Sequence, residues 1–441
     1  MERQYIKLTE RTILKLRYNQ WYLIDVKNQE KERFLVEEDS IDVLYFLFQG
    51  KSIQETAYEF GFSYEELYDF LLILNQEELI EFIDKSTDSV KKCYNIKPPL
   101  DGLNLLITNT CNLHCIYCYL DSGKAMKDEL NGELWIDILQ QAQQLGVFHL
   151  SVSGGEPLLH EDFYKIAEYI ASISTFSANL NTNGTVSIDG YENLLNKAFK
   201  SVQVSIDDII TEKHDIFRSN SGCFKESIRT IERLISYGIE TNVGFLINSK
   251  NLSALDGVVD LCEQIGVKNL NIGFVNPIGR AKKNRFAFPI TYQSLKDGNL
   301  IERMYQKFCE FAERDTKLKI LLPFQPKVTS SIAFKNKHYI CGGDNIQFMS
   351  IMADGTIMPC DVLPISAFNY GNVKAQSLID IWMSDKMKAF KLMSFKQFSD
   401  CCNCSYFQIC EGPCMARASQ TKELLQSQDL LRCLITQKIA G

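Results

Sequence analysis

The chain has 441 residues, of which 45% are hydrophobic and 23% charged, a composition typical of globular domains with apolar cores. Charged residues stand at the N-terminus with no apolar run behind them, so we expect no secretory signal peptide. No run of about 18 apolar residues predicts a transmembrane helix, and a cytoplasmic protein without a membrane partner is therefore expected.

Charge is distributed unevenly along the chain. The formal net charge is −8, and residues 1–90 contain nineteen Asp and Glu against ten Lys and Arg, which leaves about +1 for the rest. An acidic domain repels phosphate backbones, so nucleic acid is a poor partner for it. A partner with exposed Lys or Arg would be attracted.

Strands and helices near the N-terminus predict a winged-helix-like α+β domain over residues 1–88. Alternating apolar residues predict short strands at 5–8, 21–26 and 33–36. Amphipathic helices are predicted at 40–48, 52–60 and 63–74, with Ser40, Ser52 and Ser63 in N-cap positions.

A repeated β-α pattern follows over residues 100–280. Strands are predicted at 103–108, 149–153, 178–182, 201–206, 241–247 and 269–274, and helices between them at 133–145, 163–173 and 224–237, for example. Six such units in succession predict an α/β domain with a parallel sheet, closed in part as a (β/α)6 TIM barrel. Chemistry in such sheets lies at the carboxyl ends of the strands.

The last two regions are a bridging region, 281–340, and a cysteine-rich domain, 341–441. Asp354-Gly355 predicts a hairpin turn between strands at 348–352 and 356–358. One helix is predicted at 378–392.

Fifteen cysteines in a chain expected in the reducing cytoplasm favour metal binding over disulfides. Cys111, Cys115 and Cys118 form C-x3-C-x2-C directly after the first barrel strand. Three thiolates on a tight loop can bind three irons of a [4Fe–4S] cluster and leave the fourth iron open to a small molecule. The alternative is a zinc site completed by His114.

The segment Cys111-Asn112-Leu113-His114-Cys115-Ile116-Tyr117-Cys118 resembles the radical S-adenosylmethionine (SAM) superfamily, including the aromatic Tyr117 before the third cysteine. The resemblance implies that these cysteines bind the catalytic cluster. It also implies that SAM is cleaved there after the cluster accepts an electron, and that the resulting 5′-deoxyadenosyl radical abstracts a hydrogen atom.

Further positions at strand ends match the family's SAM-binding elements. The resemblance assigns the methionine amino group to the turn Gly154-Gly155-Glu156 and the methionine carboxylate to Arg218. Polar contacts to SAM are implied for Asn183, Ser205 and Asp207, and Val275–Arg280 resembles the loop near the adenine. The alternatives are a plain βα turn at 154–156 and a surface ion pair at Arg218.

The C-terminal cysteines resemble the seven-cysteine SPASM domain. Cys341 is followed by thirteen residues, Gly355, four residues and Cys360, and the series C-x2-C-x5-C-x3-C, a gap and a last cysteine completes the pattern. The resemblance implies two auxiliary [4Fe–4S] clusters, three clusters in all. Cys341, Cys360 and Cys414 would bind one, and Cys401, Cys404, Cys410 and Cys433 the other. A zinc ribbon is the alternative.

The first auxiliary cluster has only three evident ligands, because no cysteine follows Cys341 closely. Its fourth position is left open among Cys402, Asp344, a substrate group and no ligand. Cys93, Cys223, Cys262 and Cys309 fit ordinary buried cysteines.

The first domain resembles the leader-recognition element of radical SAM peptide maturases. In that family a leader peptide adds a strand to the edge of the small sheet, here the strand at about 33–37 beside the helix 63–74. A DNA-binding winged helix and a purely structural cap are the alternatives, and the negative charge opposes the first.

The sequence therefore predicts a radical SAM enzyme that modifies a ribosomally made precursor peptide, with an intrapeptide thioether or carbon–carbon cross-link as the product. Its expected partners are the peptide, bound through its leader, and a reductant such as flavodoxin or ferredoxin. A sulfatase-maturing enzyme that makes formylglycine is one alternative, although such enzymes lack the first domain. A leader-binding scaffold or regulator with structural clusters is another.

Overall fold

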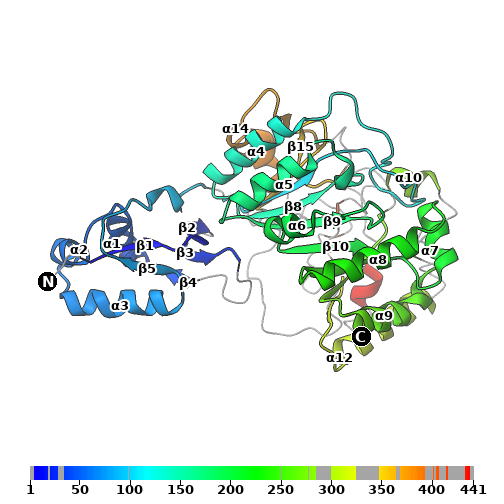
Figure 1. Ribbon diagram of the computed structural model, residues 1–441, viewed down its shortest axis with the longest axis horizontal. Helices are drawn as coiled ribbons and strands as arrows, with labels where there is room; N and C mark the ends of the chain where they lie inside the picture. The colour runs from blue at the N-terminus through cyan, green and yellow to red at the C-terminus, as the bar shows by residue number, and fades with distance from the viewer. Residues whose placement is uncertain are drawn as a thin grey trace.

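A computed structural model provides the structure of the chain. It describes residues 4–17, 20–27, 34–97, 99–248, 250–276, 278–284, 299–323, 347–363, 368–392, 401, 404–406, 414–415 and 433–437. Figure 1 shows an N-terminal domain in blue on the left and a larger body, which contains the barrel, on the right.

The N-terminal domain has an α+β fold. Its strands are β1 (Tyr5–Leu8), β2 (Thr12–Arg17), β3 (Gln20–Asp25), β4 (Phe34–Val36), β5 (Ile80–Ile83) and β6 (Cys93–Tyr94). Its helices are α1 (Glu38–Phe48), α2 (Ile53–Phe60), α3 (Tyr64–Gln76) and the 3₁₀ turn η1 (Val90–Lys92). The described strands form one sheet in the order β4-β3-β2-β6 and a separate pair β1-β5, so within this described part of the chain β4 is an edge strand, as predicted.

Two of the three predicted helix starts are confirmed by their capping hydrogen bonds. Ser52 and Ser63 each accept from the backbone three residues later, and Glu55 and Glu66 return the bond in a capping box. The prediction for Ser40 is wrong, because α1 begins at Glu38 without a side-chain cap. Strands β2, β5 and β6 were not predicted.

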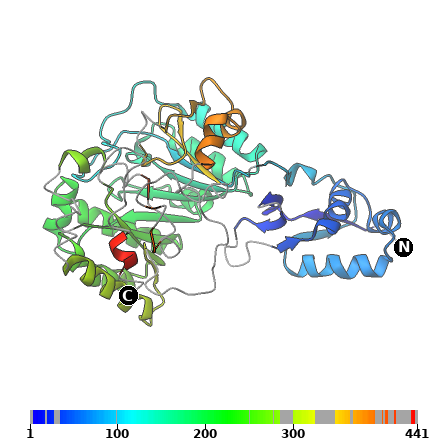
Figure 2. The same cartoon turned by 180° about the vertical axis from the view of Figure 1, so that it is seen from behind.

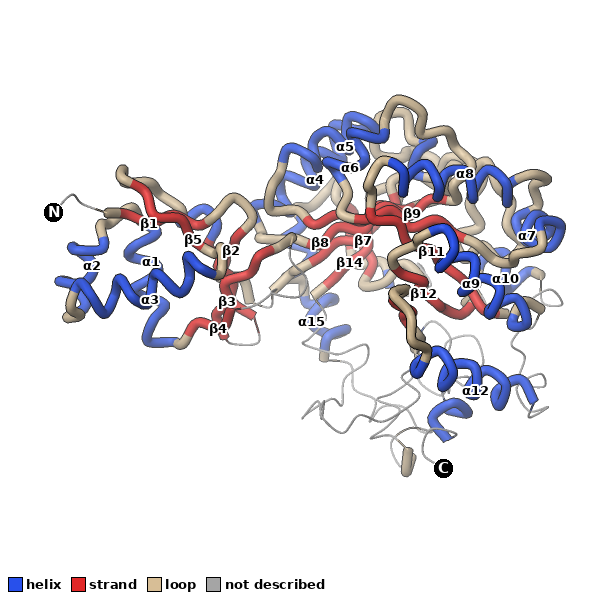
Figure 3. Tube along the Cα trace, turned by 60° about the horizontal axis from the view of Figure 1, so that its bottom comes forward, coloured by secondary structure: helices blue, strands red, loops and turns tan. Residues whose placement is uncertain are grey.

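The predicted barrel is confirmed. Its strands are β7 (Gly102–Leu106), β8 (His149–Ser153), β9 (Ser177–Thr182), β10 (Ser201–Ser205), β11 (Glu240–Ile247) and β12 (Asn269–Phe274), all parallel and adjacent in chain order. The helices are α4 (Gly132–Gln144), α5 (Phe163–Ser172), α6 (Glu192–Ala198), α7 (Thr211–Arg218), α8 (Cys223–Ser236) and α9 (Leu255–Ile265), with 3₁₀ turns η2 (Pro157–Leu159) and η3 (Leu252–Ala254). Figure 3 shows these helices on the outside of the strands.

Side chains alternate along each barrel strand. In β8, for example, Leu150 and Val152 are buried in the apolar layer beneath the helices, whereas Ser151 points to the other face. The outer face therefore supplies the core, and the inner face remains for polar residues that line the lumen.

The barrel sheet continues into the C-terminal region. Strand β13 (Lys319–Leu321) pairs with β12, and β14 (Phe348–Ile351) pairs in parallel with β7. The predicted hairpin is confirmed: β14 pairs with β15 (Thr356–Met358), Gly355 has φ +86° at the turn, and β16 (Gly371–Asn372) completes a ten-stranded sheet. The remaining helices are α10 (Gly279–Lys283), α12 (Asn299–Glu313), α14 (Leu378–Trp382) and α15 (Asp385–Lys391).

One predicted helix is divided. The segment 378–392 forms α14 and α15, because Ser384 starts a new helix by accepting a hydrogen bond from the backbone N–H of Met387. No helix in the described ranges is both long enough and apolar enough to span a membrane.

The N-terminal domain contacts the amino ends of the barrel strands, and Figure 2 shows this junction from behind. Lys15 is fully buried there and donates to the carbonyls of Leu100 and Gly146, at 2.6 Å each. Its ammonium and the guanidinium of Arg17 lie 3.0 and 2.6 Å from the carboxylate of Asp101. Burial outweighs the attraction of Asp101 and lowers the pKa of Lys15 to about 8.

Candidate active site

The three cysteines of the C-x3-C-x2-C motif lie in the loop that follows β7. Cys111, Cys115 and Cys118 all line one cavity of about 600 Å³ at the carboxyl ends of the barrel strands. Burial raises the pKa of the Cys115 thiol to about 12 in the protein alone, so a metal would have to displace its proton.

The end of helix α7 positions this cysteine loop. The backbone N–H of Ile116 donates to the carbonyl of Phe217 at 3.0 Å, and that of His114 donates to the carbonyl of Arg218 at 3.3 Å. The last carbonyls of a helix have no partners within the helix. Here these carbonyls accept hydrogen bonds from the cysteine loop and so fix its position at the end of the barrel.

Helix α10 holds the same loop from another side. The backbone N–H of Arg280 donates to the carbonyl of Cys118 at 2.8 Å, and its side-chain Nε donates to the carbonyl of Cys115 at 2.9 Å. The guanidinium also donates to the carbonyl of Ser122. Arg280 was expected in a loop near an adenine; like Val275 and Asn276 it lines the active-site cavity, and its side chain hydrogen bonds to the cysteine loop.

The glycines after β8 allow a close approach between two backbones. A Cβ atom on Gly154 would lie 2.4 Å from the carbonyl oxygen of Thr108, and one on Gly155 would lie 2.3 Å from that of Thr110. Gly154 also has φ +143°, a conformation that side chains disfavour. The turn is therefore packed against the start of the cysteine loop, and both glycines line the cavity.

Glu156 lies behind the cavity and is fully buried. Its carboxylate accepts from the Thr182 hydroxyl at 2.8 Å and from the Asn183 backbone N–H at 2.7 Å. Burial raises its pKa to about 7, although these donors act in the opposite direction. Glu156 is not among the described residues that line the cavity, so its observed role is to join the ends of β8 and β9.

Asn183 connects this buried carboxylate to the cysteine loop. Its side-chain amide donates to the side-chain oxygen Oδ1 of Asn112 at 2.9 Å and lies 3.9 Å from the sulfur of Cys111. Asn183 lines the cavity, as predicted.

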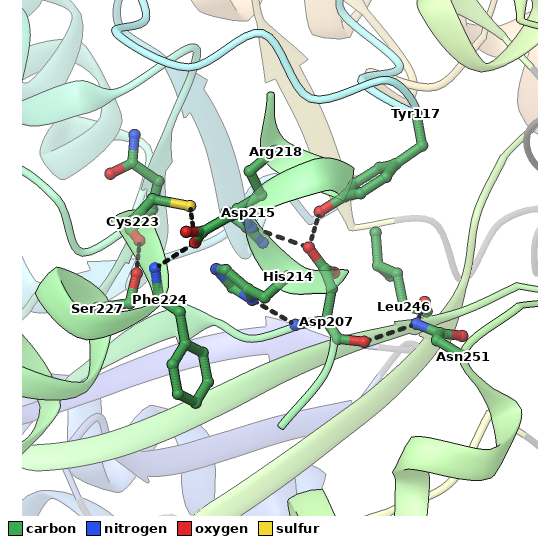
Figure 4. A network of polar contacts seen from close by, with 11 residues as sticks. Tyr117, Asp207, His214, Asp215, Arg218, Cys223, Phe224, Ser227, Leu246 and Asn251 are labelled. Atoms are coloured by element: carbon green, nitrogen blue, oxygen red, sulfur yellow. Dashed lines mark hydrogen bonds and ion pairs between the residues drawn. The ribbon is translucent and has the colours of Figure 1, made fainter. Parts of the chain in front are cut away.

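A network of polar contacts closes the opposite wall (Figure 4). The Arg218 guanidinium donates to the Asp207 carboxylate at 2.8 Å, and the Tyr117 hydroxyl donates to the same oxygen at 2.5 Å. Arg218 and Asp207 are both buried, which contradicts the alternative of a surface ion pair. These residues and Ser205 line the cavity.

His214 supports the network from below. Its Nδ1 accepts from the backbone N–H of Asp207 at 3.2 Å, and burial lowers its pKa to about 4, so the ring is neutral. The Asn251 side chain donates to the carbonyl of Asp207 at 3.0 Å. Sequence reasoning assigned no role to either residue: His214 begins the segment that ends at Arg218 but was not itself proposed as a contact, and Asn251 lies in no recognised motif.

A hydrogen bond connects the cysteine loop to the C-terminal region. The hydroxyl of Tyr119, which follows Cys118, donates to the carboxylate of Asp361, which follows Cys360, at 2.6 Å. Both side chains line the cavity. The segments that contain a motif cysteine and a predicted auxiliary ligand therefore meet at the active site.

The other predicted auxiliary ligands are only partly described. Cys401 belongs to the main apolar core, and Cys360 and Cys414 pack against it. Cys404 and Cys433 are half-buried. Cys341, Cys410, Cys402 and Asp344 lie outside the described residues.

The residues present fit an iron–sulfur cluster better than a zinc ion. Zinc requires four ligands around one atom, whereas His114 is exposed, lies against Gly123 and is absent from the described cavity lining. A [4Fe–4S] cluster takes one cysteine per iron. The cavity that the three cysteines share also presents a guanidinium, a carboxylate and an amide for a charged, polar ligand.

Two families match this chain. Residues 105–262 match the Radical SAM superfamily, and residues 341–405 match SPASM, an iron–sulfur cluster-binding domain.

Relatives and solved structures agree with these matches. The sporulation killing factor maturation protein SkfB of Bacillus subtilis is 30% identical over 280 residues, which is 63% of each chain and under two thirds of that relative. The AdoMet-dependent heme synthase of Methanosarcina barkeri is 27% identical over 71% of this chain and 90% of its own. SuiB of Streptococcus suis, solved with its precursor peptide SuiA, superposes with a TM-score of 0.72 at 17% identity, over 97% of this chain and 99% of that one.

Proposed function

We propose that this chain, which belongs to the radical SAM superfamily and carries a SPASM domain, matures a ribosomally made peptide. The domains imply [4Fe–4S] clusters and SAM as cofactors. The observation that carries the proposal is the shared cavity, in which the three cysteines of the motif face the Arg218–Asp207 pair and the Gly154-Gly155 turn.

Each wall of the cavity has a proposed task. Cys111, Cys115 and Cys118 would bind the cluster, which, when loaded, supplies the electron that cleaves SAM. The guanidinium of Arg218, oriented by Asp207, would pair with the methionine carboxylate. Ser205, Asn183 and the two glycines would complete the SAM site, and Glu156 would act by positioning Asn183.

The auxiliary clusters are proposed with the ligands that the sequence predicts, Cys341, Cys360 and Cys414 for one and Cys401, Cys404, Cys410 and Cys433 for the other. The proposal keeps the four regions predicted from the sequence, which are 1–88, 100–280, 281–340 and 341–441. A reductant such as flavodoxin or ferredoxin would supply the electron, in the cytoplasm.

The N-terminal domain is the proposed site for the leader. Among the described residues strand β4 has an unpaired edge in its sheet, and Figures 1 and 2 both show β4 beside the C-terminal end of α3. Leu35 on β4 and Ile73 on α3 are 48% and 51% exposed, so apolar side chains accompany this edge. An added strand would gain main-chain hydrogen bonds from the edge and side-chain contacts from these residues.

The names of two similar proteins support a peptide substrate. SkfB is named for maturation of a killing factor, and SuiB was solved with a precursor peptide. The product expected for this chain is an intrapeptide thioether or carbon–carbon cross-link, which removes two hydrogen atoms from the peptide.

Anaerobic reconstitution with iron and sulfide tests the proposal. We expect about twelve irons per chain, release of 5′-deoxyadenosine on adding SAM and a reductant, and a peptide product lighter by two hydrogens with a short peptide encoded beside this gene. Replacing Cys111, Cys115 and Cys118 by Ala should remove about four irons and all 5′-deoxyadenosine.

Two results would contradict the proposal. Tightly bound zinc, or intact clusters that leave SAM uncleaved, would favour a scaffold or regulator. Replacement of a cysteine thiol by an aldehyde oxygen would identify a sulfatase-type maturase.

A further inference from the structure

The lumen of the barrel below the active site is lined by neutral amides and hydroxyls. Branched apolar residues usually fill closed eight-stranded barrels. Here the inward positions of β8–β12 carry Ser, Asn and Gln side chains that bond to one another across the strands, in two rows.

The upper row crosses the sheet just below the active-site cavity. Asn271 on β12 donates to Gln203 on β10, Gln203 donates to Asn181 on β9 at 3.1 Å, and Asn181 donates to the Ser151 hydroxyl on β8 at 3.0 Å. Asn181, Gln203 and Asn271 also line the active-site cavity.

A glycine makes the upper row possible. Gly244 lies on β11, between the strands that carry Gln203 and Asn271. A Cβ atom on Gly244 would lie 2.9 Å from the side-chain nitrogen of Gln203. The missing side chain therefore leaves the space through which Gln203 crosses β11.

The lower row repeats the arrangement one step toward the amino ends of the strands. Asn269 donates to Asn242 at 2.6 Å, Asn242 donates to the Ser201 hydroxyl at 3.0 Å, and Ser201 donates to Asn179 at 2.9 Å. Both rows run in the same direction across the sheet, so each amide has an ordered orientation.

The two rows enclose a second cavity of about 230 Å³. It shares Asn181, Gln203 and Asn271 with the active-site cavity. Lys200, Glu240 and Lys319 are the charged residues among its described lining, and no aromatic ring is among them. A ligand in this cavity would therefore meet chiefly neutral donors and acceptors, without a ring on which to stack.

We propose that this amide-lined lumen is a substrate subsite that binds the main chain of an extended peptide segment beside the reacting residue. This inference rests on the proposed function. Asn and Gln side chains offer one carbonyl and one N–H₂ group each, the same groups that a peptide backbone presents. They bind a backbone without selecting its side chains, so core residues of different sequence can be accepted.

The amino-terminal opening of this subsite lies on the side where the N-terminal domain docks. Lys27 donates to the carbonyl of Phe176, and the Ser174 hydroxyl donates to the carbonyl of Glu10 at 2.8 Å, both directly before β9. The N-terminal domain, which holds the proposed leader site, therefore contacts the barrel at the amino end of β9.

Photo-crosslinking on the full-length, reconstituted protein with SAM tests the subsite. The probe is a blocked peptide of Gly, Ala and Ser that carries one benzoylphenylalanine, and the labelled residues are found by mass spectrometry. We expect labels on β9–β12, reduced at least tenfold in Asn242→Leu. The matched control is Asn196→Leu, which replaces an exposed amide on α6 and should label as the wild type does.

Iron content and melting temperature report whether Asn242→Leu folds. If Asn242→Leu does not fold, Asn269→Asp is used in its place, because Asp keeps the shape of the Asn side chain. Its labelling should also fall at least tenfold. Labels outside the lumen, or equal labelling in the folded variant, would overturn the inference. SAM cleavage without peptide is measured in parallel, so a protein that cleaves SAM but is not labelled in the lumen loses this subsite alone and keeps its proposed radical chemistry.

Discussion

The N-terminal domain and the barrel lumen offer a peptide two opposite kinds of surface. The domain presents an edge strand with exposed apolar side chains, Leu35 and Ile73, and a net negative charge. The lumen presents rows of neutral amides, such as the buried Asn242 and the half-buried Asn269, and Leu321 is the one apolar side chain in the described lining of the cavity between them. A surface of the first kind selects side chains, whereas the second accepts any backbone of the right width. The two proposals together would give one chain a selective leader site and a tolerant reaction site.

The N-terminal domain and the barrel meet at the buried ion pairs of Asp101, and a substitution of Asp101 has the largest expected effect. Asp101→Asn leaves Lys15 and Arg17 buried beside each other without their carboxylate. We expect a loss of about 3–5 kcal/mol, the cost of an uncompensated buried charge. Denaturant unfolding measures it. The control Lys7→Met breaks the exposed pair with Glu81 and should cost under about 1 kcal/mol; equal losses would contradict this role of Asp101.

The second prediction concerns the buried carboxyl group of Glu156, whose raised pKa should make the stability of the protein depend on pH. Its pKa is raised to about 7 from 4.5, so the folded protein binds the extra proton. The resulting stability is present below pH 4.5 and lost as pH rises through about 7, by about 3 kcal/mol. We expect the melting temperature of the wild type to fall relative to Glu156→Gln between pH 5 and pH 8. A constant difference would contradict the raised pKa.

Arg280 tests how firmly the cysteine loop is held. Arg280→Lys removes the forked donors to the carbonyls of Cys115 and Ser122. We expect a cost of about 2 kcal/mol in holding the loop, seen as roughly thirtyfold faster loss of the iron–sulfur absorbance to a chelator. Arg229→Lys, on the exposed face of α8, should behave as the wild type. Unchanged cluster loss in Arg280→Lys would show that α7 alone holds the loop.

The smallest expected effect is on the affinity of the N-terminal domain for the precursor peptide. It tests whether the edge of β4 is the selective surface. Leu35→Glu and Ile73→Glu should each weaken binding of the precursor peptide about tenfold, because each removes an apolar contact. SAM cleavage without peptide should remain. Tyr58→Glu, at a residue on α2 that is 89% exposed, is the control. Isothermal titration measures the affinity, and equal losses in all three variants would point to charge rather than to the β4 edge.

The barrel could be predicted from sequence because local signals agreed with the fold. The strands at 149–153 and 269–274 are confirmed to the residue, since each alternates apolar and polar side chains between clear turns. The three motif cysteines were placed at one strand end and lie together in one cavity.

The rest depends on contacts between residues far apart in the chain. Glu156 lies in a motif that predicts a ligand contact, but its carboxylate accepts from the backbone N–H of Asn183, directly after the next strand. Gly244 lies in no motif. Its role is to leave space for the Gln203 side chain, and this is visible only in the structure. Lys15 lies on β2, which was not predicted, and no residue near it in the sequence indicates that it pairs with the distant Asp101.

The parallel pairing of β14 with β7, from Phe348–Gly102 to Ile351–Leu105, has a consequence for protein engineering. Strand β7 is flanked on one side by β8 and on the other by β14, so removal of the C-terminal region would expose the edge of a largely buried strand at the start of the barrel. Such edges recruit other chains and aggregate. Chimeras that exchange the C-terminal region between relatives should therefore be cut after β16, so that the hairpin stays with the barrel it completes.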